Sequence, residues 1–296
     1  MNIVEPSVEL WTQGIDKVKH VAKCARVCYG RESGNDNALY QNLENIKHLS
    51  MFRHETYYSA IPIESNSELI YVALSRYMYN PYIKYVTYKD YCYIVTNGNF
   101  IRDIKNSNPV LYKYIINYQL TPDEAKEIEP IWQSFMRYTF CVVTQISTSR
   151  ELNRVSPNNI SEESTRYVFE DGTICRPHWM RQSALDYINT LPNLVELKSK
   201  EDRDKCGKEF YFIKECAHNF ATYKLLIEEF GMHRQDARGV LPVDTATKCA
   251  YTYSIEEWRH IIDLRYYGTT GKPHPNVKII TGMIRDELIN LGYNFK

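Results

Sequence analysis

Residues 161–167 read SEESTRY, and these residue types could hold an anion. Ser164 follows a pair of carboxylates and stands two residues before the guanidinium of Arg166. Arginine offers a planar fork of donors that suits a phosphate or a pyrimidine carbonyl, and a hydroxyl with nearby backbone amides can complete a phosphate cradle. The plainer alternative is a solvated turn with a surface ion pair. This segment alone leaves both open.

Two further arginines favour the anion site. Arg238 lies inside DARGVLP and Arg265 inside HIIDLR, and both segments are largely apolar. A guanidinium without a partner is costly in apolar surroundings, so each should have one. Pro242 stops any helix begun at Gln235, which places Arg238 near a helix end where it could point into a cleft. Structural salt bridges are the alternative partners, and the chain has enough carboxylates for them.

The bulk composition gives no long-range attraction for a charged polymer. The chain has 296 residues, with 36 Lys plus Arg against 36 Asp plus Glu and a net charge of zero. We therefore expect no nucleic-acid partner and no binding to an anionic membrane surface. No run approaches the roughly 20 apolar residues of a membrane span, and the N-terminus lacks the layout of a signal peptide, which together predict a cytoplasmic protein.

The eight cysteines indicate reduced thiols. None of them forms a CxxC pair, and only Cys24 and Cys28 share a helix face. No histidine or cysteine pair follows them at metal-ligand spacing, so core packing is the better interpretation and no metal is predicted.

Hydrophobic spacing and end signals predict a mixed helix and strand chain. Gly30 and Gly231 follow expected helices as stop signals, and Ser254 with Glu257 has capping-box spacing. The expected helices cover residues 15–28, 39–52, 208–230 and 254–265, and the expected strands follow His54 and cover residues 140–146.

The segment 62–140 reads as an insertion. Tyrosines crowd its first third, and Thr121 with Pro122 reads as a helix start. The simpler interpretation is that the tyrosines cover the core of a helical or mixed subdomain. The alternative is that they form a surface for a ligand or a partner.

Four separated segments together resemble the flavin-dependent thymidylate synthases. CARVCYG at residues 24–30 is similar to the family's AARxCY, and Arg53-His54 stands where the family has Glu-His before an aromatic strand. RVSx7S, from Arg154 to Ser164, aligns with the family's RHRx7S. LLIEEFGMHRQDARGVLP, followed by HIIDLR, resembles YxxLLxxGxxxExARxVLP and the later xLR. The resemblance covers roughly residues 15–60 and 145–290.

The resemblance implies an α/β (α+β) chain with the fold of the thymidylate synthase-complementing proteins. It would be a single domain over residues 1–296, with the inserted subdomain at about 62–140, and it would assemble as a homotetramer with FAD and dUMP where subunits meet. The family reduces FAD with NADPH, takes a methylene group from methylenetetrahydrofolate and places a methyl group on C5 of dUMP. It needs no cysteine nucleophile, because arginines polarise the uracil and the protein contributes orientation and electrostatics.

Carried over position by position, the resemblance implies a set of site residues. Arg265 would activate the uracil ring, and Ser164 would be the second catalytic residue. The nucleotide would meet Arg154, Glu162, Ser164, Arg166, Arg238 and Arg265. The cofactor would meet His54, Arg154, His260 and His274. A satisfied core histidine is the alternative for His54.

The chain also departs from the family's pattern, chiefly on the flavin side. Val155 and Ser156 replace a histidine and an arginine, and Glu151 stands where a nucleotide-contacting glutamine is common. Losing a charge-assisted contact of roughly 1.5 to 3 kcal/mol would weaken cofactor binding ten- to a hundredfold. Basic residues of the insertion, such as Arg76 or Lys84, could compensate.

These departures leave three functions open. The simplest is dUMP methylation to dTMP. A related one-carbon transfer, such as hydroxymethylation of a pyrimidine deoxynucleotide, needs no final hydride and tolerates a weak flavin site. A non-catalytic nucleotide-binding homologue belongs to a different class.

Overall fold

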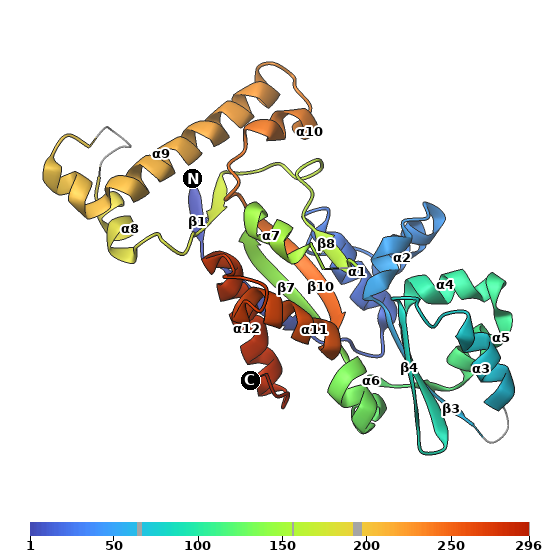
Figure 1. The fold of residues 1–296 in the computed structure, drawn as a ribbon. Helices are drawn as coiled ribbons and strands as arrows, with labels where there is room; N and C mark the ends of the chain where they lie inside the picture. Colours follow the sequence, from blue (N-terminus) through green and yellow to red (C-terminus); the bar gives the residue numbers. More distant parts are fainter. Residues whose placement is uncertain (64–66, 156, 192–196, 296) are drawn as a thin grey trace.

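The computed structural model describes residues 1–63, 67–155, 157–191 and 197–295. A four-stranded antiparallel sheet lies at its centre, with the strand order β2-β7-β10-β8 (Figure 1). Its strands are β2 (Ser7–Trp11), β7 (Arg137–Gln145), β10 (Ala246–Ser254) and β8 (Ile160–Glu162). β7 and β10 pair along their whole length, and the short β8 pairs with the middle of β10. β7 is rich in the aromatic and β-branched residues that favour strands, and the strand expected at residues 140–146 is confirmed.

Helices pack around this sheet. α1 (Lys17–Val27) and η1 (Leu49–His54) contact β8 and β10, and α12 (Pro275–Asn290) contacts β2 and β7. α11 (Ile255–Ile262) follows β10 directly and buries Trp258, whose ring meets that of Phe140 edge-on at 5.2 Å. The expected capping box is confirmed, because Ser254 and Glu257 exchange their hydrogen bonds at the start of α11. η4 (Asp263–Tyr267) continues from α11.

The region predicted as an insertion contains a second sheet with a core of its own. Its sheet has the order β4-β5-β3-β6, formed by β3 (Thr56–Pro62), β4 (Ile83–Tyr88), β5 (Tyr91–Asn97) and β6 (Gln119–Leu120). α3 (Ser67–Ser75), α4 (Gly98–Ser107) and α5 (Pro109–Asn117) accompany the sheet, and Ile94, Phe100 and Leu111 are fully buried among them. The boundaries differ from the expected 62–140. β3 joins this sheet from Thr56, because it pairs with β5, whereas β7 joins the central sheet from Arg137.

α6 (Pro122–Lys126) and η2 (Ile131–Phe135) lead from the subdomain back to the central sheet. Thr121 caps α6, as the sequence predicts, and its backbone and side chain both meet Glu124. This return segment therefore fixes where the two parts of the chain meet.

A helical arm extends from the other side of the central sheet (Figure 1). It contains α8 (Gln182–Ile188), the long α9 (Lys200–Glu228), α10 (Arg234–Ala237) and η3 (Arg238–Val240). α9 begins earlier than the expected residue 208, and its backbone departs from helical values at Cys206. Gly231 follows it with a φ of +65°, the left-handed conformation in which glycine ends helices. β1 (Asn2–Val4) and β9 (Thr173–Cys175) pair in parallel at the base of the arm.

The predicted helix 39–52 is wrong as one element. α2 (Asp36–Asn45) begins earlier, capped by Asn35, and ends before η1. Lys47 separates the two, because its φ of +55° is left-handed and cannot continue a right-handed helix. His54 thereby becomes the last residue of a separate 3-10 turn beside β3.

The predicted α/β (α+β) class is confirmed by the two antiparallel sheets and their surrounding helices. All eight cysteines are free thiols, and all of them except the half-buried Cys28 are buried. Among the described residues, no helix is both long and apolar enough to cross a membrane. The same residues contain no group of three or more His, Cys, Asp or Glu side chains that could hold a metal ion.

Candidate functional site

The SEESTRY and DARGVLP segments meet in one cleft of about 580 Å³. This volume lies within the range of small-molecule sites in proteins. The cleft lies where α7 (Ile146–Leu152), the end of β8 and the turn after α10 converge. Its polar lining includes Arg150, Glu162, Glu163, Ser164, Thr165 and Arg238.

Glu162 holds the floor of the cleft together. Its position on β8 is set by pairing with Cys249 of β10. One carboxylate oxygen accepts a hydrogen bond from Ser149 Oγ at 2.6 Å, and the other accepts one from Asn153 Nδ2 at 2.9 Å. Both partners belong to α7 or its end, so Glu162 ties that helix to the strand, and Thr247 Oγ1 adds a long contact of 3.4 Å.

Ser164 is held at the mouth of the cleft by its backbone. Its N–H donates to the carbonyl of Cys28 at 3.2 Å, just beyond the end of α1. The N–H groups of Tyr167 and Val168 both donate to the Ser164 carbonyl at 2.9 Å, which closes a tight turn. The side chain is half-buried, and its hydroxyl accepts only a long 3.4 Å contact from the Arg166 N–H. That hydroxyl is therefore available to a ligand.

Arg238 faces the same turn from the opposite wall. Its Nη1 donates to Thr165 Oγ1 at 3.1 Å, and Arg166 Nη2 reaches Gln235 Oε1 at 3.4 Å. Among the described residues, no ion pair involves Arg150, Arg166 or Arg238. The structural salt bridge left open for Arg238 is thus not formed, and the expectation of an apolar setting is wrong because its side chain is exposed. Its charge is free to meet an anion.

Arg150 is a cleft residue that the sequence reasoning missed. It lies on α7, exposed, and lines the cleft together with Arg238. The available signal was its position one helical turn before Arg154, on a helix that leads directly into the SEESTRY segment. The cleft therefore presents two guanidinium groups, two hydroxyls and the carboxyl group of Glu163 to a ligand, and burial raises the pKa of that carboxyl.

His54 occupies the core and not the cleft. It is fully buried, and its Nδ1 lies 2.7 Å from Thr252 Oγ1 while its Nε2 lies 2.9 Å from Ser161 Oγ. Burial lowers its pKa to about 3, and the charges of His20, Arg137 and Arg53 act in the same direction. With both ring nitrogens occupied, His54 has the geometry of the satisfied core histidine in this single chain.

The other expected cofactor residues lie on the surface and outside the cleft. Arg154 and His260 are exposed. His274 is also exposed, and its Nδ1 caps α12 by accepting from the Asn276 N–H at 3.3 Å. Neither these three residues nor His54 lines any of the five main pockets formed by the described residues.

Arg265 also lies apart from Arg238 and Ser164. It is half-buried in η4, beside α12, and does not line the cleft. Its Nε is buried without a hydrogen-bond partner among the described residues. Buried donors are nearly always paired in native proteins, so this N–H is available to a water molecule or a ligand.

The structure describes Val155 but not Ser156, the two positions at which the chain departs from the family on the flavin side. Val155 is 8% exposed and packs in the main core, so its side chain replaces the family's histidine with a core contact. Ser156 lies outside the described residues. Of the residues considered for compensation, Lys84 pairs with Glu256 at 3.6 Å and Arg76 is exposed, and neither lines the cleft. Glu151 is half-buried and is also absent from the lining.

A family model described as "Thymidylate synthase complementing protein" matches residues 110–283. The chain belongs to this family. The match includes β7, the SEESTRY turn, Arg238 and Arg265, so it confirms the relationship that the motifs indicate. No curated protein matches the chain in a sequence search.

Solved structures of similar description are more distant. A UMP/dUMP methylase, PolB, from Streptomyces cacaoi bound with 5-Br dUMP is 17% identical over 98% of this chain and 93% of that chain, with a TM-score of 0.43. Thymidylate Synthase X from Helicobacter pylori, with FAD and dUMP, is 13% identical over 78% of this chain and 91% of that chain, with a TM-score of 0.36.

Proposed function

We propose that this protein transfers a one-carbon unit to C5 of dUMP, in its simplest form by methylation to dTMP. Family membership supports the reaction class. The observation that carries the proposal is the meeting of Ser164 and Arg238, far apart in sequence, in one cleft. Neither side chain contacts a carboxylate among the described residues.

The cleft's own groups suit the nucleotide phosphate. Arg238 and Arg150 supply positive charge without a carboxylate partner, and the hydroxyls of Ser164 and Thr165 can donate to phosphate oxygens. Glu162 is already satisfied by Ser149 and Asn153, so its proposed role is to position the turn. Arg166 is exposed next to this turn and is proposed to contact the nucleotide from its rim.

The uracil ring requires groups that one chain does not bring to the cleft. We propose that Arg265 and Arg154 meet the nucleotide across a subunit boundary, in the homotetramer that the family resemblance implies. The unpartnered Nε of Arg265 supports an incomplete site in the single chain. There the guanidinium would stabilise negative charge that develops on the ring.

FAD is proposed as the cofactor on family grounds, with NADPH and methylenetetrahydrofolate as co-substrates. The residues of one chain do not fit it. His54 is buried with both ring nitrogens bonded, and Val155 is part of the core. Arg154, His260 and His274 are exposed and could contribute only at a boundary between subunits.

This mismatch favours hydroxymethylation as the second candidate. Two of the family's flavin-side positions, those of His54 and Val155, face the interior of the protein. A transfer of hydroxymethyl takes the same one-carbon unit from the folate but needs no final hydride. A protein that binds the nucleotide without catalysis would keep the cleft and lose both folate and flavin chemistry.

The visible absorption spectrum of the purified protein separates these functions first. The methylation proposal predicts a yellow protein, or one that becomes yellow and stays so when loaded with FAD and freed of excess. The mass of the nucleotide product then distinguishes dTMP from hydroxymethyl-dUMP. A colourless protein that leaves dUMP unchanged in the presence of folate would contradict both enzymatic functions.

A further inference from the structure

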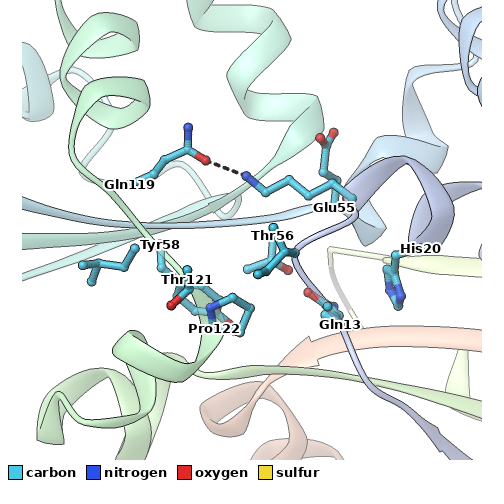
Figure 2. Close-up of a pocket in the computed structure, with 12 residues that line it drawn as sticks. Gln13, His20, Glu55, Thr56, Tyr58, Gln119, Thr121 and Pro122 are labelled. Atoms are coloured by element: carbon cyan, nitrogen blue, oxygen red, sulfur yellow. Dashed lines mark hydrogen bonds between the residues drawn. The ribbon is translucent and has the colours of Figure 1, made fainter.

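A second hollow of about 160 Å³ lies where the inserted subdomain meets the rest of the chain (Figure 2). Its wall comes from the segment before α1, from α1 itself, from β3 and from the β6–α6 junction. Lys17 Nζ donates to Gln119 Oε1 at 2.6 Å, and Figure 2 marks this hydrogen bond by the dashed line that ends at Gln119. None of the residues that line the dUMP cleft lines this hollow.

We propose that this hollow is a second small-molecule site, which binds a neutral six-membered lactam ring, that is, a ring with an adjacent N–H and C=O. The proposal does not depend on the function assigned to the cleft.

The size of the hollow fits one ring. An engineered protein cavity of about 150 Å³ takes up a single benzene molecule. Ile15, Tyr58, Leu120 and Pro122 provide apolar lining for the faces of such a ring. A purely apolar ligand would leave the polar groups of the wall without partners, so the ring must also carry polar atoms at its edge.

Gln13 provides an acceptor for that edge. Its Nε2 donates to Thr139 Oγ1 at 3.0 Å, which fixes the amide and leaves its carbonyl oxygen without a partner among the described residues. The oxygen suits a ligand N–H. Lys17 provides the complementary donor, because it gives one of its three protons to Gln119 and retains two.

His20 can meet either end of a lactam edge. Its Nε2 lies 3.0 Å from Thr139 Oγ1, and its Nδ1 has no partner in the part of the chain that the structure describes. Burial lowers its pKa to about 4, so the ring is neutral near pH 7. When Thr139 donates to Nε2, Nδ1 carries a proton for the ligand C=O; when Nε2 donates to Thr139, Nδ1 accepts from the ligand N–H.

Thr56 points to an occupant independently. It lines the hollow, is 6% exposed, and its hydroxyl is buried without a hydrogen-bond partner among the described residues. Buried hydroxyls are almost always paired in native proteins. Rotation of the Thr56 side chain to another staggered χ1 rotamer can turn the hydroxyl toward a ligand.

The charges around the hollow favour a neutral ligand. The carboxylate of Glu55 lines it but already accepts from Tyr57 at 2.8 Å and from Arg102 at 2.9 Å. Lys17 lies 3.6 Å above the centre of the Tyr57 ring, which compensates its charge in part. Lys17 would repel a cation and Glu55 would repel an anion, whereas a neutral lactam is repelled by neither.

Calorimetric titration of the full-length protein with α-pyridone tests the proposal. N-methyl-α-pyridone is the matched ligand, since it has the same ring and carbonyl but no N–H. The expected result is that α-pyridone binds, and that N-methyl-α-pyridone binds at least about tenfold more weakly, the effect of one lost hydrogen bond. Saturating dUMP should not displace α-pyridone. Absence of binding, equal affinity of the two ligands, or displacement by dUMP would each overturn the proposal.

Two variants locate the site. Gln13→Leu should weaken α-pyridone at least about tenfold, whereas the same substitution at Gln41, exposed on α2, should leave it unchanged. Thr56→Val should weaken binding without lowering the melting temperature of the free protein, because it removes a hydroxyl that has no protein partner. This second variant keeps the test valid if Gln13→Leu does not fold. Unchanged affinity in Thr56→Val and in a folded Gln13→Leu would place the ligand elsewhere.

Discussion

The Nδ1 atom of His54 lies 2.7 Å from the hydroxyl oxygen of Thr252, inside the protein. Thr252 in turn lies 2.7 Å from the hydroxyl of Thr139, which contacts His20. A continuous hydrogen-bonded chain therefore crosses the two central strands, β7 and β10, with a neutral histidine at each end. The position of His54, which the family resemblance assigns to the cofactor, therefore lies inside the core of the single chain.

Both histidines make stability depend on pH. Their folded pKa values of about 4 and about 3 lie below the ordinary 6.5, so acid favours the unfolded state, which binds the proton more readily. The stabilisation is complete above the unfolded pKa and is lost as pH falls from 6.5 towards the folded values. His20→Gln keeps a donor near Thr139 but cannot titrate.

We expect the wild-type protein to lose about 1.4 kcal/mol of unfolding free energy per pH unit relative to His20→Gln over this range. Urea unfolding at several pH values measures the difference. If the unfolding free energies of the two proteins change with pH in parallel, His20 is not held neutral in the folded state.

Arg238 and Arg166 are the nucleotide anchors that binding measurements test most simply. Arg238→Ala should weaken dUMP binding by about 1.5 to 3 kcal/mol, the value of a charge-assisted hydrogen bond, and Arg166→Ala should have an effect of the same sign. Arg203→Ala, which removes an exposed arginine from α9, is the control. If calorimetry gives wild-type affinity for both anchor variants with the fold intact, the assignment of the cleft fails.

Arg265 is proposed to act on the ring during the reaction. Arg265→Lys keeps the positive charge but loses the planar fork, so turnover should fall more than dUMP affinity does. Steady-state kinetics together with dUMP titration of the same sample gives both values. Equal losses of turnover and affinity would assign Arg265 to substrate binding alone.

Val155 tests whether the flavin side has been remodelled. Because its side chain packs in the main core, Val155→His should place a polar ring among apolar side chains and destabilise the protein by about 1 to 3 kcal/mol. Val155→Ile remains apolar and should cost less. Thermal unfolding measures both, and FAD titration accompanies it. Tighter FAD binding by Val155→His, with an unchanged melting temperature, would instead indicate an eroded flavin site that the family residue restores.

Local signals predicted much of the fold. The capping pairs at Thr121 and Ser254 and the stop at Gly231 mark helix ends through contacts between near neighbours, which a sequence displays directly. The break at Lys47 was missed, because no glycine marks the left-handed conformation there. The recruitment of β3 into the subdomain sheet depends on pairing with β5, a contact between distant segments that periodicity does not encode.

Some residues of the candidate site could be predicted from motifs, whereas others depend on contacts between distant segments. Ser164 and Arg238 belong to motifs, and the structure brings their segments together. His54 was ambiguous because a motif position does not reveal burial, and its partners Thr252 and Ser161 come from separate strands. Arg150 carries no motif of its own, and only the packing of α7 beside the SEESTRY turn places it in the cleft.

The most direct test of the proposed function uses dUMP tritiated at C5. The protein, preloaded with FAD, is incubated with this nucleotide, methylenetetrahydrofolate and NADPH, and both the tritium released to water and the product mass are measured. Replacement of the C5 hydrogen by a one-carbon unit requires release of the label, and the account predicts release that depends on the folate and is abolished in Arg238→Ala. A folded protein that binds dUMP but releases no tritium and returns the nucleotide unchanged would contradict it.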